Sequence, residues 1–454
     1  MLPLIQQFLE KRDFTGLRDF IGQLNPPTLA DIISQLPPNE QAVIFRILPQ
    51  KIAAATFEYI DINNQEELLK ALGKNEVAAI LNDMSPDDRT QLLEELPGEV
   101  TKKLLMLLSP DERKVALTFL GYPEDSIGRM MTSDYIAVPP EWTVKQVLDH
   151  IRQSGQDSET LNVIYVIDKY GLLIDDIRVR EFLLAPLDKR VDHIMTRQFV
   201  TLKATDNQET AIEIFKRYDR VALPVTDTQG VLIGIVTIDD IFDVAEEEAT
   251  EDIQRIGGMQ ALDEPYTTIP LPQMIRKRAG WLVILFIGET FTATAMGFFE
   301  DEISKAVVLA LFIPLIISSG GNSGSQAATL VIRALALGEI KKKDVWRVIR
   351  REAVSGLLLG TVLGTIGFVR IALWSSFSTV YGPHWIQLAW TVFFSLIGVV
   401  LWGTLSGATL PLLLKRAGLD PATSSAPFVA TLVDVTGLVI YFFVASILLH
   451  GILL

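Results

Sequence analysis

The chain has 454 residues and a formal net charge of −15, yet 49% of its residues are hydrophobic. A single compact domain rarely combines such acidity with a positive mean hydropathy, so we expect a charged soluble part joined to a very apolar part. The balance of 55 Asp and Glu against 40 Lys and Arg argues against nucleic acid as a partner. With no cysteine and only four scattered histidines, the chain leaves oxygen atoms as metal ligands, and oxygen suits hard cations.

The first 125 residues predict a domain of short helices. Proline marks three helix starts, in LPPNE at 36–40, MSPDD at 84–88 and LSPDE at 108–112. In each segment an acidic residue follows within the first turn, as is typical of helix N-termini. The spacing indicates stacked helix pairs, an α-superhelical domain over residues 1–125, although an ordinary helical domain is the alternative. The N-terminus carries early acidic residues and no long apolar core, so we expect no signal peptide and a cytosolic N-terminal half.

Two similar segments follow, over residues 126–190 and 191–243. The sequence MMTSDYIAV at 130–138 recurs as IMTRQFVTL at 194–202. Each copy continues into an amphipathic helix, an apolar strand, a glycine turn and a second strand and helix. We therefore predict two tandem α/β repeats that pair and bury each other's apolar faces.

These repeats resemble a pair of CBS domains. The resemblance is carried by Met195, Thr196, the strand at 221–225 and the motif GIVTIDD at 234–240. In such pairs the Thr and the last Asp of this motif often hold adenine nucleotides, which implies an ATP site at Thr237 and Asp240. The first repeat has LIDDIR at 173–178 instead, so we expect at most one nucleotide site in each chain. The alternative is a pair that binds no ligand and acts only mechanically.

An acidic stretch at 244–264 predicts a helix that connects the repeats to the apolar part. Glu248, Glu251 and Asp252 share one face of this helix, at positions i, i+3 and i+4. Like charges at this spacing oppose helix formation by roughly 0.2–0.5 kcal/mol per pair, and a bound cation would reverse that penalty. A solvated acidic linker helix is the alternative.

Residues 265–454 predict a transmembrane domain with five helices. Apolar stretches near the ~20 residues needed to cross a lipid bilayer run roughly over 280–299, 305–337, 353–374, 386–414 and 427–450. Lys and Arg precede the first stretch and lie between the second and third and between the fourth and fifth, whereas one remaining loop is acidic and the other has no Lys or Arg. This alternation predicts a multi-pass inner-membrane protein with its N-terminus in the cytoplasm and its C-terminus outside.

Three features of the apolar stretches carry candidate chemistry. The segment SSGGNSGSQ at 318–326 places small and hydroxyl residues in the membrane, where they form either a solute path or a packing seam between helices. Asp434 lies within the last stretch, and an ionised carboxylate at mid-bilayer costs ~2.5–3.5 kcal/mol, so such residues usually line a water-filled path. Glu289 in the first stretch raises the same question, although a proton or a hydrogen bond to a neighbouring threonine would also satisfy it.

Along essentially its full length the chain resembles the MgtE family of magnesium channels. The resemblance is carried by the order of the domains and by EATEDI at 248–253, Pro314 with GGNSGSQ at 320–326, and PFVATLVDVTG at 427–437. It implies a homodimer whose Mg²⁺ pore lies on the two-fold axis at Asp434. It also implies a plug helix over 244–264 with Glu248, Glu251 and Asp252 as ligands, and a contact of the plug with Asp420. Further acids that sense cytosolic Mg²⁺ are implied in the N domain and the second repeat, at Asp83, Asp87, Asp239, Asp240 and Asp243.

The physical chemistry of Mg²⁺ fits this resemblance, and two other interpretations stay open. Mg²⁺ binds oxygen and gives up its waters reluctantly, so facing carboxylates can hold it hydrated. A CBS-regulated secondary carrier for another solute would need a proton-linked acid such as Glu289. A membrane-anchored receptor would bind ATP at Thr237 and Asp240 without transport. An enzyme is not expected, because the sequence offers no evident nucleophile–base pair, phosphate-binding loop or histidine cluster.

Overall fold

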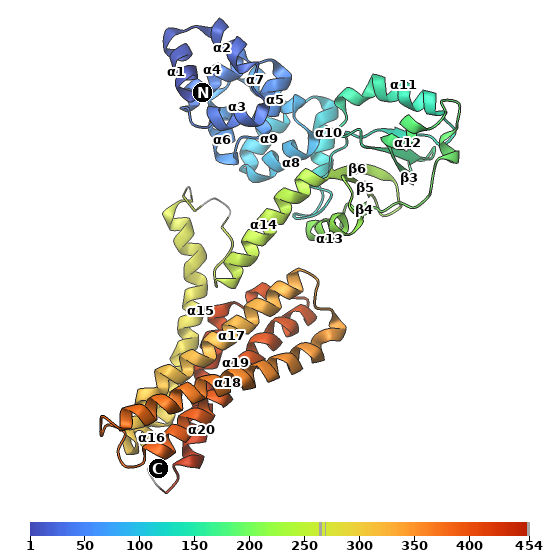
Figure 1. Cartoon of the computed structure of the whole chain (residues 1–454). Helices are drawn as coiled ribbons and strands as arrows, with labels where there is room; N and C mark the ends of the chain where they lie inside the picture. The colour runs from blue at the N-terminus through green and yellow to red at the C-terminus, as the bar shows by residue number, and fades with distance from the viewer. Residues whose placement is uncertain (263–265, 268, 452–454) are drawn as a thin grey trace. The chain divides into compact units, whose positions relative to one another are not determined.

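The structure, a computed structural model, describes residues 1–262, 266–267 and 269–451 (Figure 1). The chain divides into two compact units, Met1–Glu246 and Glu247–Leu454.

The first part of unit 1 is a stack of short helices. These are α1 (Leu2–Lys11), α2 (Phe14–Ile21), α3 (Pro26–Ile33), α4 (Pro38–Ile47), α5 (Gln50–Glu58), α6 (Ile62–Ala71), α7 (Lys74–Asp83), α8 (Pro86–Glu95), α9 (Gly98–Leu105) and α10 (Pro110–Phe119). Pro38, Pro86 and Pro110 begin their helices, as the sequence predicts, because proline needs no hydrogen bond at the first helical position. Helices two apart in sequence pack together, such as α3 with α5 and α5 with α7, over one continuous apolar core. The predicted helical N domain is confirmed.

The second part of unit 1 contains two similar three-stranded sheets. The first repeat has β1 (Ala137–Val138), α11 (Val144–Ser154), η1 (Gly155–Asp157), β2 (Val163–Ile167), β3 (Leu173–Arg178) and α12 (Val179–Leu184). The second has η2 (Val191–His193), β4 (Leu202–Lys203), α13 (Gln208–Tyr218), β5 (Ala222–Thr226), β6 (Leu232–Thr237) and the start of α14 (Ile238–Ile256). In both, the first strand runs parallel to the second and the second antiparallel to the third. Bridges from Leu172 to Val231 and from Thr132 to Ile235 join the repeats, which confirms the predicted pair.

Helix α14 begins and ends earlier than the helix predicted over 244–264. It continues directly from the last strand of the second repeat and stops at Ile256, before Gly257. Gly258 has a φ of +74°, and a Cβ there would lie 2.7 Å from the Trp281 ring, so this turn requires glycine. Residues 263–264 of the predicted helix lie outside the described residues.

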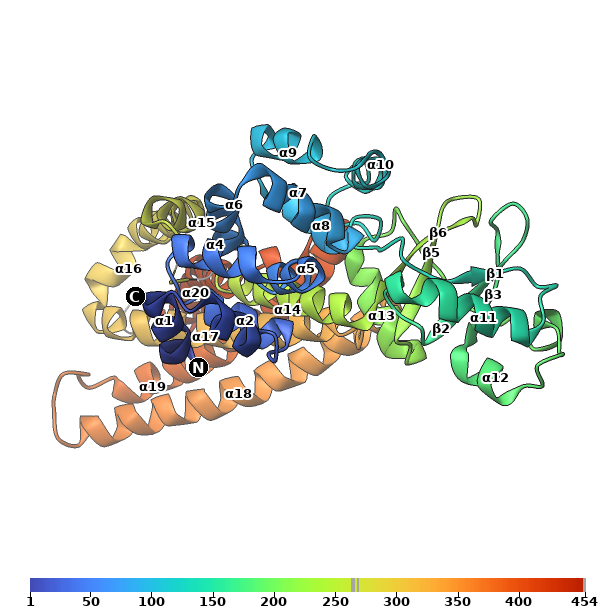
Figure 2. The same ribbon diagram turned by 90° about the horizontal axis from the view of Figure 1, so that it is seen from above.

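Unit 2 is a bundle of long helices (Figures 1 and 2). It contains α15 (Leu271–Phe298), α16 (Glu300–Lys305), η3 (Val307–Phe312), α17 (Ile313–Ala336), η4 (Lys342–Asp344), α18 (Val345–Ser375), α19 (Trp385–Arg416), η5 (Pro421–Thr423) and α20 (Ala426–Leu448). Among the described residues five helices are long and apolar enough to cross a membrane, which confirms the predicted number. They cover 271–298, 307–336, 345–375, 385–416 and 426–449.

Small residues let the long helices approach one another closely. Helices α18 and α19 lie side by side (Figure 2), and a Cβ on Gly360 of α18 would stand 2.7 Å from the Cα of Ile397. Helix α17 stays helical through the segment 318–326, and a Cβ on Gly320 would stand 2.8 Å from Val433 of α20. These glycines therefore set the distances between helix axes in the bundle.

Candidate functional site

The acid of the last span, Asp434, lies where α17 and α20 meet. Its carboxylate is half-buried, and a Cβ on Gly321 would stand 3.3 Å from its Oδ1 and 3.4 Å from Ala430. None of the salt bridges formed by the described residues includes Asp434. The small neighbours leave the carboxylate accessible, and no fixed cation of the described chain neutralises it.

Hydroxyl and indole groups fix the helix that carries Asp434. Thr436, two residues further along α20, donates to the carbonyl of Leu432 at 2.8 Å and accepts from the Trp402 indole at 2.7 Å. Ser425 caps the start of α20 and accepts from the Trp281 indole of α15 at 3.0 Å. The hydroxyl of Thr436 is thus occupied by structural contacts, which hold the carboxylate two residues before it in position.

Acids from three parts of unit 1 gather around the start of α14. We call them the acidic cluster; its members are Glu58, Asp87 and Asp88 of the N domain, Glu159 of the first repeat, and Asp239, Asp240 and Asp243 of α14. The charges of Asp87 and Asp240 act on each other, as do those of Asp88 and Asp239. The cluster therefore couples the N domain electrostatically to the second repeat.

Burial and crowding raise the pKa values within the acidic cluster. Burial raises the pKa of Glu58 to about 7, and the charge of Asp88 adds to it. Burial also raises the pKa of Asp240 to about 7, although hydrogen bonds from Thr237 oppose this. Asp87 is only 9% exposed, and burial followed by the charge of Asp240 holds its pKa well above the ordinary value. Such shifts mean that the ionised cluster lacks a countercharge.

The acidic cluster is close enough for repulsion but is not a converged metal site. Among the described residues no group of three or more acidic or histidine side chains has the geometry to hold a metal ion directly. Asp87 is nevertheless poised to bind, because its buried Oδ1 has no hydrogen-bond partner in the described part of the chain. Its carboxylate fits a cation that keeps its water shell, as Mg²⁺ usually does.

The sequence identified part of this cluster and missed the rest. Of the predicted sensing acids, Asp87, Asp239, Asp240 and Asp243 lie in the cluster. Asp83 is exposed at the end of α7, and no interaction described for the chain joins it to the cluster. Glu58, Asp88 and Glu159 were missed; only Asp88, adjacent to Asp87, had a signal in the sequence.

The C-terminal half of α14 belongs to unit 2 and carries a bridging arginine. Arg255 forms a salt bridge of 2.7 Å with Glu251 one turn before it and donates to Asp420 at 2.8 Å. Asp420 also caps the short helix η5 before α20. Glu251 and Asp420, predicted as cation ligands, are therefore held by a guanidinium in this structure. Glu248 and Asp252 lie on the same part of α14, and both take part in other interactions.

The two residues predicted to bind ATP bond to each other. Thr237 donates to Asp240 from its hydroxyl at 2.7 Å and from its amide at 3.2 Å. In the first repeat Asp175 accepts from the amides of Thr196 and Arg197, at 2.7 and 2.9 Å, at the position where the second repeat has Gly234. Asp175, where the first repeat differs from the motif, thus has a structural role, because its carboxylate holds the start of the second repeat.

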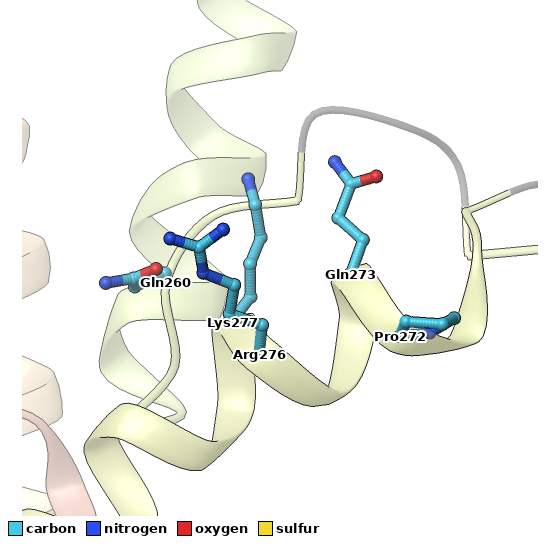
Figure 3. Close-up of a pocket in the computed structure, with 5 residues that line it drawn as sticks. All are labelled: Gln260, Pro272, Gln273, Arg276 and Lys277. Carbon is cyan, nitrogen blue, oxygen red and sulfur yellow. The ribbon is translucent and has the colours of Figure 1, made fainter.

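A hollow of about 570 Å³ at the start of α15 is a poor candidate for a cation site (Figure 3). It is lined by Gln260, Pro272, Gln273, Arg276 and Lys277. Lys277 donates to the carbonyl of Ala261 at 2.5 Å. Two basic side chains repel a divalent cation, so the hollow anchors the turn before α15 rather than binding Mg²⁺.

The fold defines a class: a multi-pass membrane protein that also carries a CBS pair and a helical N domain. Family profiles agree, matching a divalent cation transporter domain at 313–444, an MgtE intracellular N domain at 24–125, and CBS domains at 127–187 and 191–247. The chain is 36% identical to the magnesium transporter MgtE of Thermus thermophilus, over 99% of this chain and 98% of that protein. It is 31% identical to MgtE of Bacillus subtilis, over 97% and 95% of the two chains. The chain belongs to the MgtE family of magnesium transporters.

Solved structures of relatives cover the N-terminal half. The cytosolic domain of the Mg²⁺ channel MgtE in complex with ATP is 31% identical, covers 54% of this chain and 100% of that one, and has a TM-score of 0.52. The soluble part of a magnesium transporter is 26% identical, covers 55% and 98%, and has a TM-score of 0.53. Both support the arrangement of helical domain and CBS pair in unit 1.

Proposed function

We propose that this chain forms a homodimeric, Mg²⁺-selective channel of the cell inner membrane, closed by Mg²⁺ on its cytosolic side. The observation that carries the proposal is Asp434, a half-buried carboxylate inside a membrane span with small neighbours and no salt bridge to any described residue. At mid-bilayer such a charge costs ~2.5–3.5 kcal/mol, so it lines a water-filled path. No basic side chain of the described residues neutralises Asp434, so the cation that pairs with this carboxylate is the conducted ion.

The way in which Asp434 binds Mg²⁺ follows from the hydration of the ion. Mg²⁺ demands octahedral oxygen coordination and loses water slowly, so a conducting site holds it through its waters. Two Asp434 carboxylates facing each other across a dimer axis bind a hydrated ion firmly enough for entry and weakly enough for release. Family membership supports Mg²⁺ as the conducted ion.

The homodimer is supported by apolar surface on the CBS pair. Leu183 and Leu184 of α12 are 66% and 77% exposed, and Phe242 of α14 is 68% exposed. Leu183 and Phe242 occupy matching positions, one in each repeat, each five residues after the last strand ends. Large apolar side chains left exposed at matching positions are typical of an interface, and a second copy of the chain is the proposed partner.

Closure of the pore originates in the acidic cluster. Without a cation its carboxylates repel, which opposes the close approach of the N domain and the second repeat. Bound Mg²⁺ reverses that repulsion and stabilises the compact arrangement, and α14 links this change to unit 2. Glu248, Glu251 and Asp252 on α14 and Asp420 before α20 form the contact at the pore end. Cation binding thus biases a two-state element.

Two further assignments follow. ATP binds at Thr237 and Asp240 when their mutual hydrogen bond opens, and the ATP complex of the related cytosolic domain supports this. The N-terminus is cytoplasmic and the C-terminus outside, because basic residues lie at the ends of the spans assigned to the cytosol, among them Arg276, Arg278 and Lys415.

The test is Mg²⁺ influx into liposomes that contain the purified full chain, with low or high Mg²⁺ on the cytosolic face, beside Asp434→Ala. We expect conduction at low Mg²⁺, closure at high Mg²⁺ and loss of conduction in the variant. A variant that conducts like the wild type places the pore elsewhere. A wild type that moves no Mg²⁺ while binding ATP at Thr237 and Asp240 supports a nucleotide receptor without transport.

A further inference from the structure

The first span touches the rest of unit 2 along a single stripe. Trp281 donates to Ser425, and a Cβ on Gly288 would stand 2.8 Å from Thr431. Further along, Thr292 is buried and Phe299 stacks on Phe442 with ring centroids 4.7 Å apart. The contacting residues follow one another at intervals of seven, four and seven, which places them on one side of α15; this side faces α20 and the remainder is exposed.

Glu289 lies at the edge of this stripe and level with Asp434. It follows Gly288, which contacts Thr431, and Asp434 comes one turn after Thr431 on α20. The charges of Glu289 and Asp434 act on each other. Both spans begin at the same predicted membrane face and run in the same direction, so the two carboxylates occupy the same depth.

The exposed surface around Glu289 is apolar. Phe286, Ile287 and Phe291 are 72%, 54% and 59% exposed on the same turns of α15. A carboxylate among such residues cannot face lipid without a large penalty, and no salt bridge among the described residues neutralises it. Glu289 is itself exposed on α15, and its charge acts on that of Asp434, beside which a water-filled path lies under the proposed function.

A buried hydroxyl beside Glu289 points to a ligand at this level. Thr290 and Thr294 satisfy their hydroxyls on helix carbonyls, at 2.6 Å to Ile287 and 3.1 Å to Thr290. Thr292 is only 7% exposed, yet its hydroxyl has no hydrogen-bond partner in the described part of the chain. Thr292 lies on the turn after Glu289, and a buried hydroxyl of this kind normally meets water or a ligand.

We infer that Glu289 is a second carboxylate of the Mg²⁺ path, which together with Asp434 and the hydroxyl of Thr292 holds the water shell of the ion and selects divalent over monovalent cations. The inference rests on the proposed function and adds a residue to the same site. Two carboxylates in each protomer double the negative charge at one depth. Because attraction scales with ionic charge, the doubling favours Mg²⁺ over Na⁺.

The experiment measures Mg²⁺ and Na⁺ influx separately in liposomes that contain the full chain. We expect Glu289→Gln to lower the ratio of Mg²⁺ to Na⁺ influx by about tenfold or more, since one charge of two is lost. Glu289→Asp keeps the charge and should restore most of the ratio. The matched control is Glu300→Gln, an exposed acid of α16 just beyond the span, which should leave the ratio unchanged.

The outcomes separate this inference from the proposed function. If Asp434→Ala abolishes Mg²⁺ influx while Glu289→Gln keeps wild-type influx and selectivity, only the role of Glu289 is overturned. If influx follows an imposed proton gradient and Glu289→Gln removes that dependence, Glu289 is a proton acceptor and the inference is also overturned. A wild-type chain that carries no Mg²⁺ overturns the proposed function itself. Thermal melting of each variant in detergent separates loss of selectivity from loss of folding.

Discussion

The acids of the two units are arranged in opposite ways. In unit 1 seven carboxylates crowd around the start of α14, with raised pKa values for members such as Glu58 and Asp240. In unit 2 Asp434 and Glu289 lie inside membrane spans, among small or apolar neighbours. We expect the carboxylates of the acidic cluster to move closer together when a cation binds, because the cation removes their repulsion. The carboxylates on the packed spans are fixed in place, so a cation can bind them without moving the helices. Under the proposed function, the same residue type thus serves sensing in one unit and conduction in the other.

Magnitudes explain why the crowded acids respond to a cation. Two unit charges about 8 Å apart repel by ~2 kcal/mol at an effective dielectric constant near 20. Several such pairs together rival the ~5–15 kcal/mol by which a typical domain is stable. The compact form of unit 1 therefore needs either protons or cations at the acidic cluster.

The strongest test of this contrast neutralises Asp434 in unit 2 and, separately, two acids of the cluster in unit 1. Asp434→Asn should lower Mg²⁺ influx by about a hundredfold, because the path loses its main charge. The double variant Asp87→Asn/Asp240→Asn removes part of the repulsion that opposes the compact form, so it should conduct less than the wild type at low Mg²⁺ and respond less to added Mg²⁺. Liposome influx at both concentrations measures the two effects.

The matched control for the cytosolic variant is Asp83→Asn, since Asp83 is exposed and lies outside the cluster. It should conduct and close like the wild type. A double variant with the wild-type response to Mg²⁺ at both concentrations, or an altered response in Asp83→Asn, would place the sensor elsewhere in unit 1.

The second test removes the ligand. A fragment of residues 1–246, which form one compact unit, should be stabilised by millimolar Mg²⁺ and destabilised by chelation. At about 100 times the dissociation constant the gain is ~2.7 kcal/mol, equivalent to a rise in Tm of roughly 5–10 °C for a unit of this size. Scattering should also report a smaller radius of gyration. The control is calorimetry in NaCl of matched ionic strength. An equal rise in Tm in NaCl would mean that salt only screens the repulsion between the acids and that Mg²⁺ does not bind specifically.

The third test uses pH in place of Mg²⁺. Burial raises the pKa of Glu58 from its ordinary value of 4.5 to about 7 in the folded unit, so the folded form binds more protons than the unfolded form between these values. Asp240 behaves likewise, from 3.8 to about 7. The stability that these protons give is present at low pH and is lost as pH rises through about 7. In chelator, the Tm of the 1–246 fragment should therefore fall between pH 5 and pH 8, and Mg²⁺ should restore it at pH 8. A Tm that rises over this range would contradict the crowding of unpaired acids.

Local sequence patterns predicted most of the fold. They also identified those acids that lie within such a pattern. Five apolar stretches, the recurrence of MMTSDYIAV and proline at helix starts are all properties of contiguous residues, and the structure agrees with each. Asp434 could be identified because a charge within an apolar stretch is visible without a structure.

Residues whose role depends on distant contacts could not be identified in this way. Glu58 and Glu159 interact with each other and with Asp88 only through packing of the N domain on the repeats, and neither has a local signal. The early end of α14 depends on the Trp281 ring against Gly258, a contact between two elements. Arg255 was missed because its partner Asp420 is 165 residues away in sequence.

The smallest effect is expected at Arg255, which pairs with two acids of unit 2 that belong neither to the acidic cluster nor to the spans. Arg255 lies between Glu251 and Asp420 and is partly exposed, so each salt bridge contributes only ~0.2–1 kcal/mol after screening by water. Arg255→Ala leaves these two acids to repel each other and loosens the end of α14 against the loop before α20. The Mg²⁺ concentration that half-closes the channel should therefore rise by about two- to fivefold, as those energies imply. Mg²⁺ replaces the guanidinium only incompletely, because it keeps its waters.

Arg255→Lys, which keeps the charge, should stay near the wild type. If Arg255→Ala instead closes at lower Mg²⁺, the arginine competes with Mg²⁺ for Glu251 and Asp420, and these acids are ligands that the resting structure blocks.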